Sequence, residues 1–120
     1  MTKKTLVIGA SDNPSRYSYL AVQRLAAHGH PVVALGKRGG QIGGVPIVTD
    51  RPTDTDFDTV TLYLSPGNQK EYYDYVLSLR PKRLVFNPGA ENEAFAAMAA
   101  GAGIQPMEAC TLVLLSTGQF

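Results

Sequence analysis

Short apolar runs alternate with longer amphipathic stretches along the chain. Residues 4–9 and residues 31–36 each form a mostly apolar run that ends in glycine. Such runs are typical of strands that are buried on both faces of a parallel sheet. Between them, apolar residues recur at spacings of three and four as far as Gly29, which stands where a helix commonly ends. The first third of the chain therefore predicts a β-α-β unit, with its helix starting near Ser18.

The same alternation continues to the end of the chain. Pro46 and Pro106 fall inside two later runs, and because proline cannot donate a ladder hydrogen bond, we place both strands at sheet edges. The basic, glycine-rich stretch at 37–44 is expected to be a turn. The remaining predicted elements are strands at 45–48, 58–64, 83–86 and 104–109, helices at 69–80 and 91–102, and one or two helical turns at 111–117. The residues expected on the inward face of the 91–102 helix are Phe95, Met98, Ala99 and Ala102.

Strands that alternate with helices predict an α/β fold with a parallel sheet and helices on both faces. Right-handed crossovers leave few topologies open. We expect a Rossmann-like three-layer sandwich with about five strands in the order 3-2-1-4-5, to which one more edge strand can be added. The whole chain, residues 1–120, is expected to be a single domain.

Composition narrows the class of protein. The chain has 44% apolar and 18% charged residues and a net charge of +1, which suits a packed core and argues against wholesale nucleic-acid binding. Its single cysteine, Cys110, excludes an internal disulfide framework and a multi-cysteine zinc site. No run approaches the roughly 20 apolar residues of a membrane span, and the apolar run behind Lys4 is too short for a signal peptide. We expect a cytoplasmic domain with no membrane partner.

Ligands of open parallel sheets bind beyond the carboxyl ends of the strands. The predicted loops at that edge are 9–17, 36–44, 65–68 and 87–92, each rich in Gly, Pro, Ser or Asn. The first of them stands where a dinucleotide fingerprint would be, but Ser11 and Pro14 replace its second and third glycines. A pyrophosphate can still meet backbone N–H groups, the Ser11 hydroxyl and the Arg16 guanidinium there. An ordinary strand-to-helix turn is the alternative.

The end of the second predicted strand carries cations where an NAD site carries an acid. Lys37 and Arg38 follow Gly36. Two cations suit a phosphorylated ribose, either the 2′-phosphate of NADP or the 3′-phosphate of coenzyme A (CoA). A solvated basic turn is the alternative. A chain of 120 residues leaves no room for the substrate domain of an NADP enzyme. CoA is therefore favoured by elimination.

Two proline-containing loops are expected to wall the ligand. Ser65-Pro66-Gly67 and Asn87-Pro88-Gly89 each follow a predicted strand and would lie beside the pyrophosphate. In the alternative interpretation, these prolines only end the strands.

The sequence offers no catalytic constellation. His28 and His30 fall at the amino edge of the sheet, whereas Ser11, Ser65 and Cys110 fall at the carboxyl edge, about 16 Å away across a five-residue strand. Metal ligation by the two histidines lacks carboxylate support. Cys110 is expected to be a small buried hydrophobe, with a disulfide to the CoA thiol as the alternative. The residues expected to provide only solubilising charge are Lys3, Lys4, Arg80, Lys82 and Arg83.

Three segments of the chain resemble those of a known family. Gly9-Ala10-Ser11-Asp12-Asn13-Pro14-Ser15-Arg16, the later Phe86-Asn87-Pro88-Gly89-Ala90-Glu91-Asn92 and Glu108-Ala109-Cys110-Thr111 resemble the small bacterial CoA-binding domain proteins. These are similar to the CoA-binding domain of the succinyl-CoA synthetase α subunit. The resemblance implies a Rossmann-like fold with CoA or an acyl-CoA as ligand.

The resemblance also implies roles for individual residues. The first loop would hold the pyrophosphate, Lys37 would lie by the 3′-phosphate, and the two proline loops would line the arm and adenine region. The candidate binding residues are Gly9, Ala10, Ser11, Asn13, Arg16, Lys37, Arg38, Ser65, Pro66, Asn87 and Pro88. Family members commonly have Val-Asn-Pro where this chain has Leu35-Gly36-Lys37. The synthetase's phosphohistidine belongs to a domain that this chain lacks, so the resemblance gives no support for ligase chemistry.

The function expected from the sequence is CoA or acyl-CoA binding by a stand-alone domain without catalysis. The alternatives are an NADP-dependent or acyl-transfer enzyme, and an interaction domain whose nucleotide pocket is vestigial. A homodimer is the default expectation for assembly, and an enzyme partner is the alternative.

Overall fold

Strands that are buried on both faces form the centre of a mostly parallel sheet. The computed structural model describes residues 2–120. All four residues of β1 (Thr5–Ile8), β5 (Thr59–Leu62) and β6 (Arg83–Phe86) are buried. β1 pairs in parallel with β2 (Val32–Leu35) on one side and with β5 on the other. This arrangement confirms the predicted α/β class.

The sheet has seven strands in the order β3-β4-β2-β1-β5-β6-β7. The five strands predicted with the order 3-2-1-4-5 are β1, β2, β4 (Val45–Val48), β5 and β6, and they keep that order inside the larger sheet. β7 (Gln105–Glu108) adds one edge, in agreement with the prediction from Pro106. β3 (Gly40–Ile42) adds the other edge, which the sequence does not predict.

The β3–β4 pair is an antiparallel hairpin within the stretch expected to be a turn. Gly43, at φ +59°, begins the two-residue turn, as a type II′ hairpin requires. β4 is therefore not the sheet edge, and our placement of Pro46 at an edge is wrong. Pro46 is tolerated because β4 pairs with β2 only from Ile47 onward, so no ladder bond to β2 is lost at residue 46.

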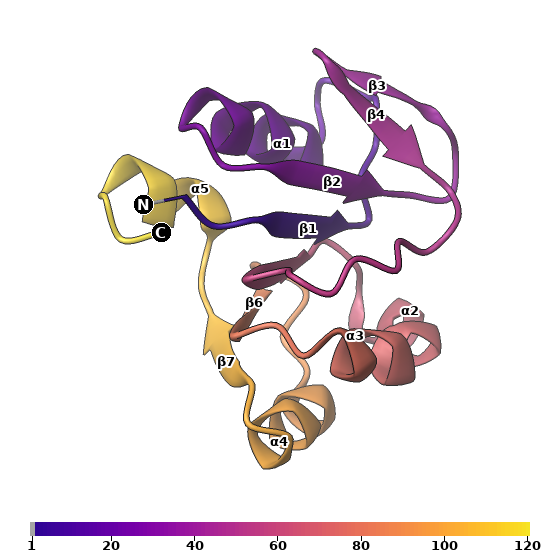
Figure 1. Cartoon of the computed structure of the whole chain (residues 1–120), viewed down its shortest axis with the longest axis vertical. Helices are drawn as coiled ribbons and strands as arrows, with labels where there is room; N and C mark the ends of the chain where they lie inside the picture. Colours follow the sequence, from indigo (N-terminus) through magenta and orange to yellow (C-terminus); the bar gives the residue numbers. More distant parts are fainter. Residues whose placement is uncertain (1) are drawn as a thin grey trace.

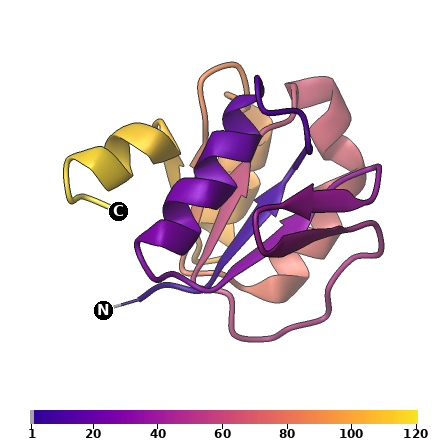
Figure 2. The ribbon, with the colours of Figure 1, turned by 90° about the horizontal axis from the view of Figure 1, so that it is seen from above.

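Helices cover both faces of the sheet (Figures 1 and 2). α1 (Tyr17–Ala27) and α5 (Thr111–Ser116) pack on one face, where Val22 and Leu114 join Val7 and Ala34 in one apolar cluster. α3 (Tyr73–Leu79) and α4 (Glu93–Gly101) pack on the other face. The structure is thus the predicted three-layer sandwich.

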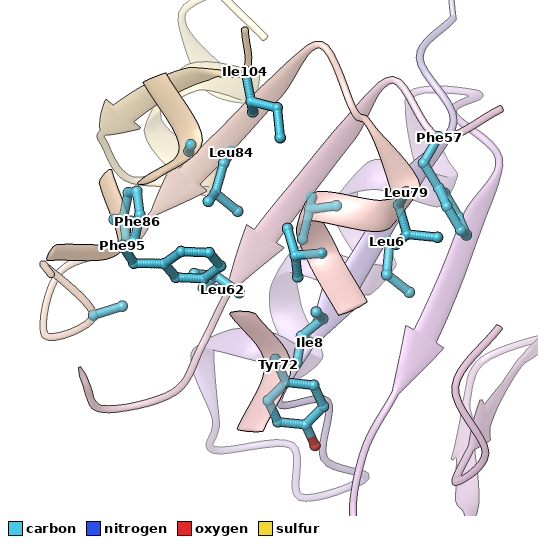
Figure 3. Packing of buried hydrophobic residues seen from close by; sticks show 14 of the residues in the cluster. Leu6, Ile8, Phe57, Leu62, Tyr72, Leu79, Leu84, Phe86, Phe95 and Ile104 are labelled. Atoms are coloured by element: carbon cyan, nitrogen blue, oxygen red, sulfur yellow. The ribbon is translucent and has the colours of Figure 1, made fainter. Parts of the chain in front are cut away.

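The larger apolar cluster lies between the sheet and α3 and α4 (Figure 3). Phe95 is fully buried and meets the edge of Phe86 at a ring-centroid distance of 5.8 Å. Ala99 is buried as predicted, but Met98 is 40% exposed and Ala102 is exposed, so two of the four expected inward residues are wrong. The helix turns only a narrow stripe toward the sheet.

The helix predicted at 69–80 begins earlier and is divided into three segments. These are α2 (Pro66–Gln69), a 3₁₀ turn at Lys70–Tyr72 and α3. Pro66 occupies the first helical position, where a missing N–H costs no hydrogen bond. The placement of Pro66 in a strand-ending loop is therefore wrong, and the helix starts three residues before its predicted first residue.

Two of the basic residues expected to be solvated have structural partners. Arg83 is 9% exposed, donates from Nε to Thr59 Oγ1 at 2.7 Å and stacks on the Phe120 ring at 4.2 Å. Burial lowers the pKa of Arg83. Lys4 Nζ pairs with Asp54 and Asp56 at 2.6 and 2.7 Å, and these hydrogen bonds raise its pKa. The prediction of purely solubilising charge is wrong for both.

No helix within residues 2–120 combines the length and the apolarity needed to cross a bilayer.

Candidate functional site

A cleft of about 600 Å³ opens at the carboxyl edge of the sheet, where the loops after β1, β2, β5 and β6 meet. Its lining comprises Gly9, Ala10, Ser11, Ser15, Arg16, Tyr17, Ser18, Lys37, Tyr63, Leu64, Ser65, Pro88, Gly89 and Ala90. The structure therefore brings together seven of the eleven predicted binding residues, namely Gly9, Ala10, Ser11, Arg16, Lys37, Ser65 and Pro88.

Close backbone approaches shape the floor of the cleft. Gly9 has φ +93°, and a Cβ at this position would lie 2.5 Å from the carbonyl oxygen of Tyr63. A Cβ on Gly36 would lie 2.4 Å from the carbonyl oxygen of Ala10. The N–H groups of Gly9 and Ala10 both donate to the Leu35 carbonyl at 3.0 Å, so they are not available to a ligand. These contacts hold the chain ends of β1, β2 and β5 close together.

The loop before α1 is ordered by Asn13. Its side-chain Oδ1 accepts hydrogen bonds from the Ser15 amide at 3.0 Å and the Ser15 hydroxyl at 2.8 Å, and its carbonyl accepts from the Arg16 amide. Asn13 does not line the cleft. It shapes the turn that aims the first residues of α1 at the cleft.

The N-terminus of α1 lies at the cleft with backbone amides that have no partner in the fold. Arg16, the N-cap residue, has an extended backbone and makes no side-chain capping bond. The amides of Tyr17 and Ser18 donate to no other group within the described chain. Both residues line the cleft. Unpaired N–H groups and the positive end of the helix dipole favour a phosphate at this position.

Two cationic side chains line the same cleft. Arg16 and Lys37 are both exposed, and neither is part of a salt bridge within residues 2–120. Arg38 is exposed but does not line the cleft. The positive charge expected after the second strand therefore reaches the cleft through Lys37.

The opposite wall is formed by the loops after β5 and β6. Ser65 and Pro88 line it, whereas Pro66 turns into α2 and does not. Asn87 is 1% exposed, and its amide is used inside the fold. Its Nδ2 donates to Thr61 Oγ1 at 2.6 Å and to the Leu62 carbonyl at 2.8 Å. Its Oδ1 accepts from the Thr111 amide at 2.9 Å, so Asn87 joins β5, β6 and α5.

Seven lining residues are not among the candidate binding residues, although Gly89 belongs to a loop expected to wall the ligand: Ser15, Tyr17, Ser18, Tyr63, Leu64, Gly89 and Ala90. All but Tyr63 and Leu64 lie within or directly after loops that the sequence assigns to the ligand edge. Tyr63 and Leu64 belong to a longer fourth strand in the prediction, but β5 ends at Leu62. The Tyr63 hydroxyl is buried without a hydrogen-bond partner within the described chain, and burial raises its pKa.

The histidines and the cysteine lie outside this cleft. His30 Nδ1 accepts a hydrogen bond from the Lys3 amide at 2.9 Å, at the amino edge of the sheet. Cys110 is the N-cap residue of α5 and is half-buried. A disulfide between Cys110 and a ligand thiol stays a prediction. No group of three or more His, Cys, Asp or Glu side chains suited to a metal ion occurs among residues 2–120.

The order of the strands and the cleft at their carboxyl ends define a Rossmann-like domain. The model of the CoA binding domain family matches residues 3–116, and the chain belongs to this family.

Solved structures agree with this fold. One described as the crystal structure of an uncharacterized protein is 48% identical, with a TM-score of 0.97 over 100% of this chain and 99% of that one. A hypothetical protein from Pyrococcus horikoshii is 21% identical, with a TM-score of 0.86 over 97% of this chain and 83% of that one. Aspartate dehydrogenase from Thermotoga maritima is 17% identical, with a TM-score of 0.59 over 98% of this chain and 51% of the enzyme. No curated protein matches the sequence.

Proposed function

We propose that this chain binds coenzyme A or an acyl-CoA in the cleft, without catalysing a reaction on it. The observation that carries the proposal is the uncapped N-terminus of α1, which faces a cleft bearing two unpaired cations. Membership of the CoA binding domain family supports the choice of ligand.

Each part of the ligand has a matching group. The pyrophosphate binds the amides of Tyr17 and Ser18 and the side chains of Ser11 and Arg16, because these groups supply donors and positive charge at one place. The pantetheine arm runs along the wall between the loops after β5 and β6.

Lys37 receives the 3′-phosphate in this proposal, since it is the cation of the second loop that lines the cleft. Arg38 adds positive potential beside it and makes no direct contact. Ala10, Asn13 and Asn87 act by fixing the backbone around the ligand, and Pro66 acts by starting α2.

Calorimetry with CoA and dephospho-CoA tests this assignment. A hydrogen bond to a charged group contributes about 1.5–3 kcal/mol, so CoA should bind on the order of tenfold or more tightly than dephospho-CoA. Lys37→Ala should remove this preference. Lys82→Ala is the matched control, because Lys82 is 86% exposed and precedes β6 at the opposite edge of the sheet. Equal affinity of the unaltered protein for both ligands would show that Lys37 does not bind the 3′-phosphate.

A thermal-shift panel separates the proposal from its alternatives. A ligand that binds only the folded chain raises the melting temperature, so CoA and acetyl-CoA should do so and NADP should not. A shift with NADP alone would favour the NADP-dependent enzyme. No shift with any nucleotide would favour an interaction domain.

A further inference from the structure

Gln69, the last residue of α2, is a fully buried carboxamide with 0% exposure. Its Nε2 donates to the Leu64 carbonyl at 2.8 Å and to the Ala90 carbonyl at 2.7 Å. A carboxamide nitrogen has two hydrogens, so both are used. The side chain thus joins two backbone segments that lie 26 residues apart in sequence.

The two carbonyls belong to the two loops that wall the cleft. Leu64 follows β5, Ala90 follows β6, and both residues line the cleft. The ladder between these strands ends at the Leu62–Phe86 pair. Beyond that pair, hydrogen bonds between the strands no longer fix the spacing of the two loops. Gln69 joins the loops just beyond the end of this ladder.

A neighbouring side chain holds the Gln69 amide in this orientation. Asn92 Nδ2 donates to Gln69 Oε1 at 3.1 Å and to the Tyr73 hydroxyl at 2.8 Å. Asn92 Oδ1 accepts from the Phe95 amide at 3.0 Å and so caps α4. The Gln69 oxygen must face Asn92, and its nitrogen must face the two carbonyls.

We propose that Gln69 is a positioning residue for the ligand cleft: it fixes the separation of the Leu64 and Ala90 loops, between which the ligand arm lies. This proposal rests on the proposed function, because it assigns Gln69 an effect on CoA binding. Gln69 does not line the cleft, so it acts through the two backbone segments and not by contact.

The test compares Gln69→Met and Gln69→Glu with the unaltered protein. Methionine has a similar volume and donates no hydrogen bond, and a carboxylate only accepts. Gln105→Met is the matched control, because Gln105 is exposed at the start of β7, away from the cleft. Affinity for CoA is measured well below each variant's melting temperature, where a loss of stability alone leaves the dissociation constant unchanged.

We expect at least a tenfold loss of CoA affinity in both Gln69 variants and no loss in Gln105→Met. The carbonyl ¹³C resonances of Leu64 and Ala90, measured without ligand, should shift in both Gln69 variants and not in the control. If one variant fails to fold, the other carries the test.

Unchanged affinity in a folded Gln69 variant whose two carbonyl resonances have moved would overturn the positioning role while leaving the proposed function intact. A failure of the unaltered protein to bind CoA would overturn the proposed function and this inference with it. The carbonyl resonances would then still report whether the bridge between the loops exists in solution.

Discussion

At the scale of single residues, the closest backbone approaches in the cleft depend on the absence of a side chain. Gly9 combines a left-handed φ of +93° with a position at which a Cβ would lie 2.5 Å from the Tyr63 carbonyl oxygen. Real Cβ atoms do not approach an oxygen this closely, and residues with a Cβ rarely adopt this φ. A side chain at position 9 would therefore cost free energy twice, through the clash with Tyr63 and through the unfavourable φ.

Gly9→Ala should therefore lower the free energy of unfolding by about 2–4 kcal/mol, as the sum of backbone strain and displacement of β5. Urea denaturation measures this change. Gly101→Ala is the matched control, since Gly101 is helical with open space at its Cβ position. Alanine at position 101 should raise the free energy of unfolding by up to about 1 kcal/mol. Equal stability of the two variants would contradict the strain argument.

Sequence reasoning identifies residues by their chemistry, and it succeeds where that chemistry is exposed. Arg16 and Lys37 are found because each is a cation in a loop expected at the ligand edge of the sheet, and both line the cleft. Asn87 is assigned to the ligand, whereas the structure buries its amide, which bonds to the Thr61 hydroxyl and to two backbone groups. Gln69 stands out in the sequence only as the start of a helix. A carboxamide in the sequence gives no sign of whether it faces a ligand or bridges two carbonyls.

At the scale of elements, α1 begins without a side-chain cap at the edge of the cleft. Arg16 has the extended backbone of an N-cap residue, but its side chain accepts no hydrogen bond. Ser, Thr, Asp or Asn at this position would satisfy one of the free amides. The amides remain free for a ligand because a non-capping residue occupies the position.

Arg16→Asp should therefore separate stability from binding. The aspartate caps α1 and raises the free energy of unfolding by about 1 kcal/mol, while it repels the pyrophosphate and abolishes CoA binding. Arg16→Gln removes the charge without supplying a strong cap, so it should weaken binding and leave stability nearly unchanged. Urea denaturation and calorimetry measure the two effects. A less stable aspartate variant would show that the α1 N-terminus is satisfied in some other way.

The central elements are predictable because burial on both faces leaves continuous apolar runs, as in β1 and β6. The β3–β4 hairpin is not predictable in this way, because β3 is three residues long and carries a glycine and a glutamine. Its only buried residue is Ile42, which belongs to the apolar cluster on the α1 face of the sheet. A strand this short is specified by its partner and its turn, and not by its own pattern.

At the scale of the whole molecule, His30 joins the segment before β1 to the end of the chain. Its Nδ1 accepts from the Lys3 amide, and its ring packs on Phe120 at a centroid distance of 5.1 Å. Burial lowers the pKa of His30, and the nearby charges of Lys3, His28 and Arg83 lower it further. Protonation at Nδ1 would remove the acceptor and add a cation beside these groups.

Stability should therefore fall as the pH drops below about 6.5, the ordinary histidine value, because the unfolded chain then binds a proton that the folded chain resists. Above that pH, His30 is neutral in both states and makes its full contribution to the free energy of unfolding. His30→Gln keeps an acceptor and does not titrate, so its unfolding free energy should fall less between about pH 7.5 and about pH 5. Parallel urea titrations at the two pH values give the comparison, and identical pH profiles for the unaltered protein and His30→Gln would contradict it.

The outer edge of β7 is short of hydrogen-bond donors. Gln105 and Ala109 donate inward to Lys82 and Phe86, so the backbone of the alternate residues 106 and 108 faces outward. Proline at 106 leaves Glu108 as the one outward amide of the strand. A strand from another molecule docking there would meet a carboxylate and a gap in its ladder. We expect this edge to be a poor template for fibril growth, even when the protein is crowded.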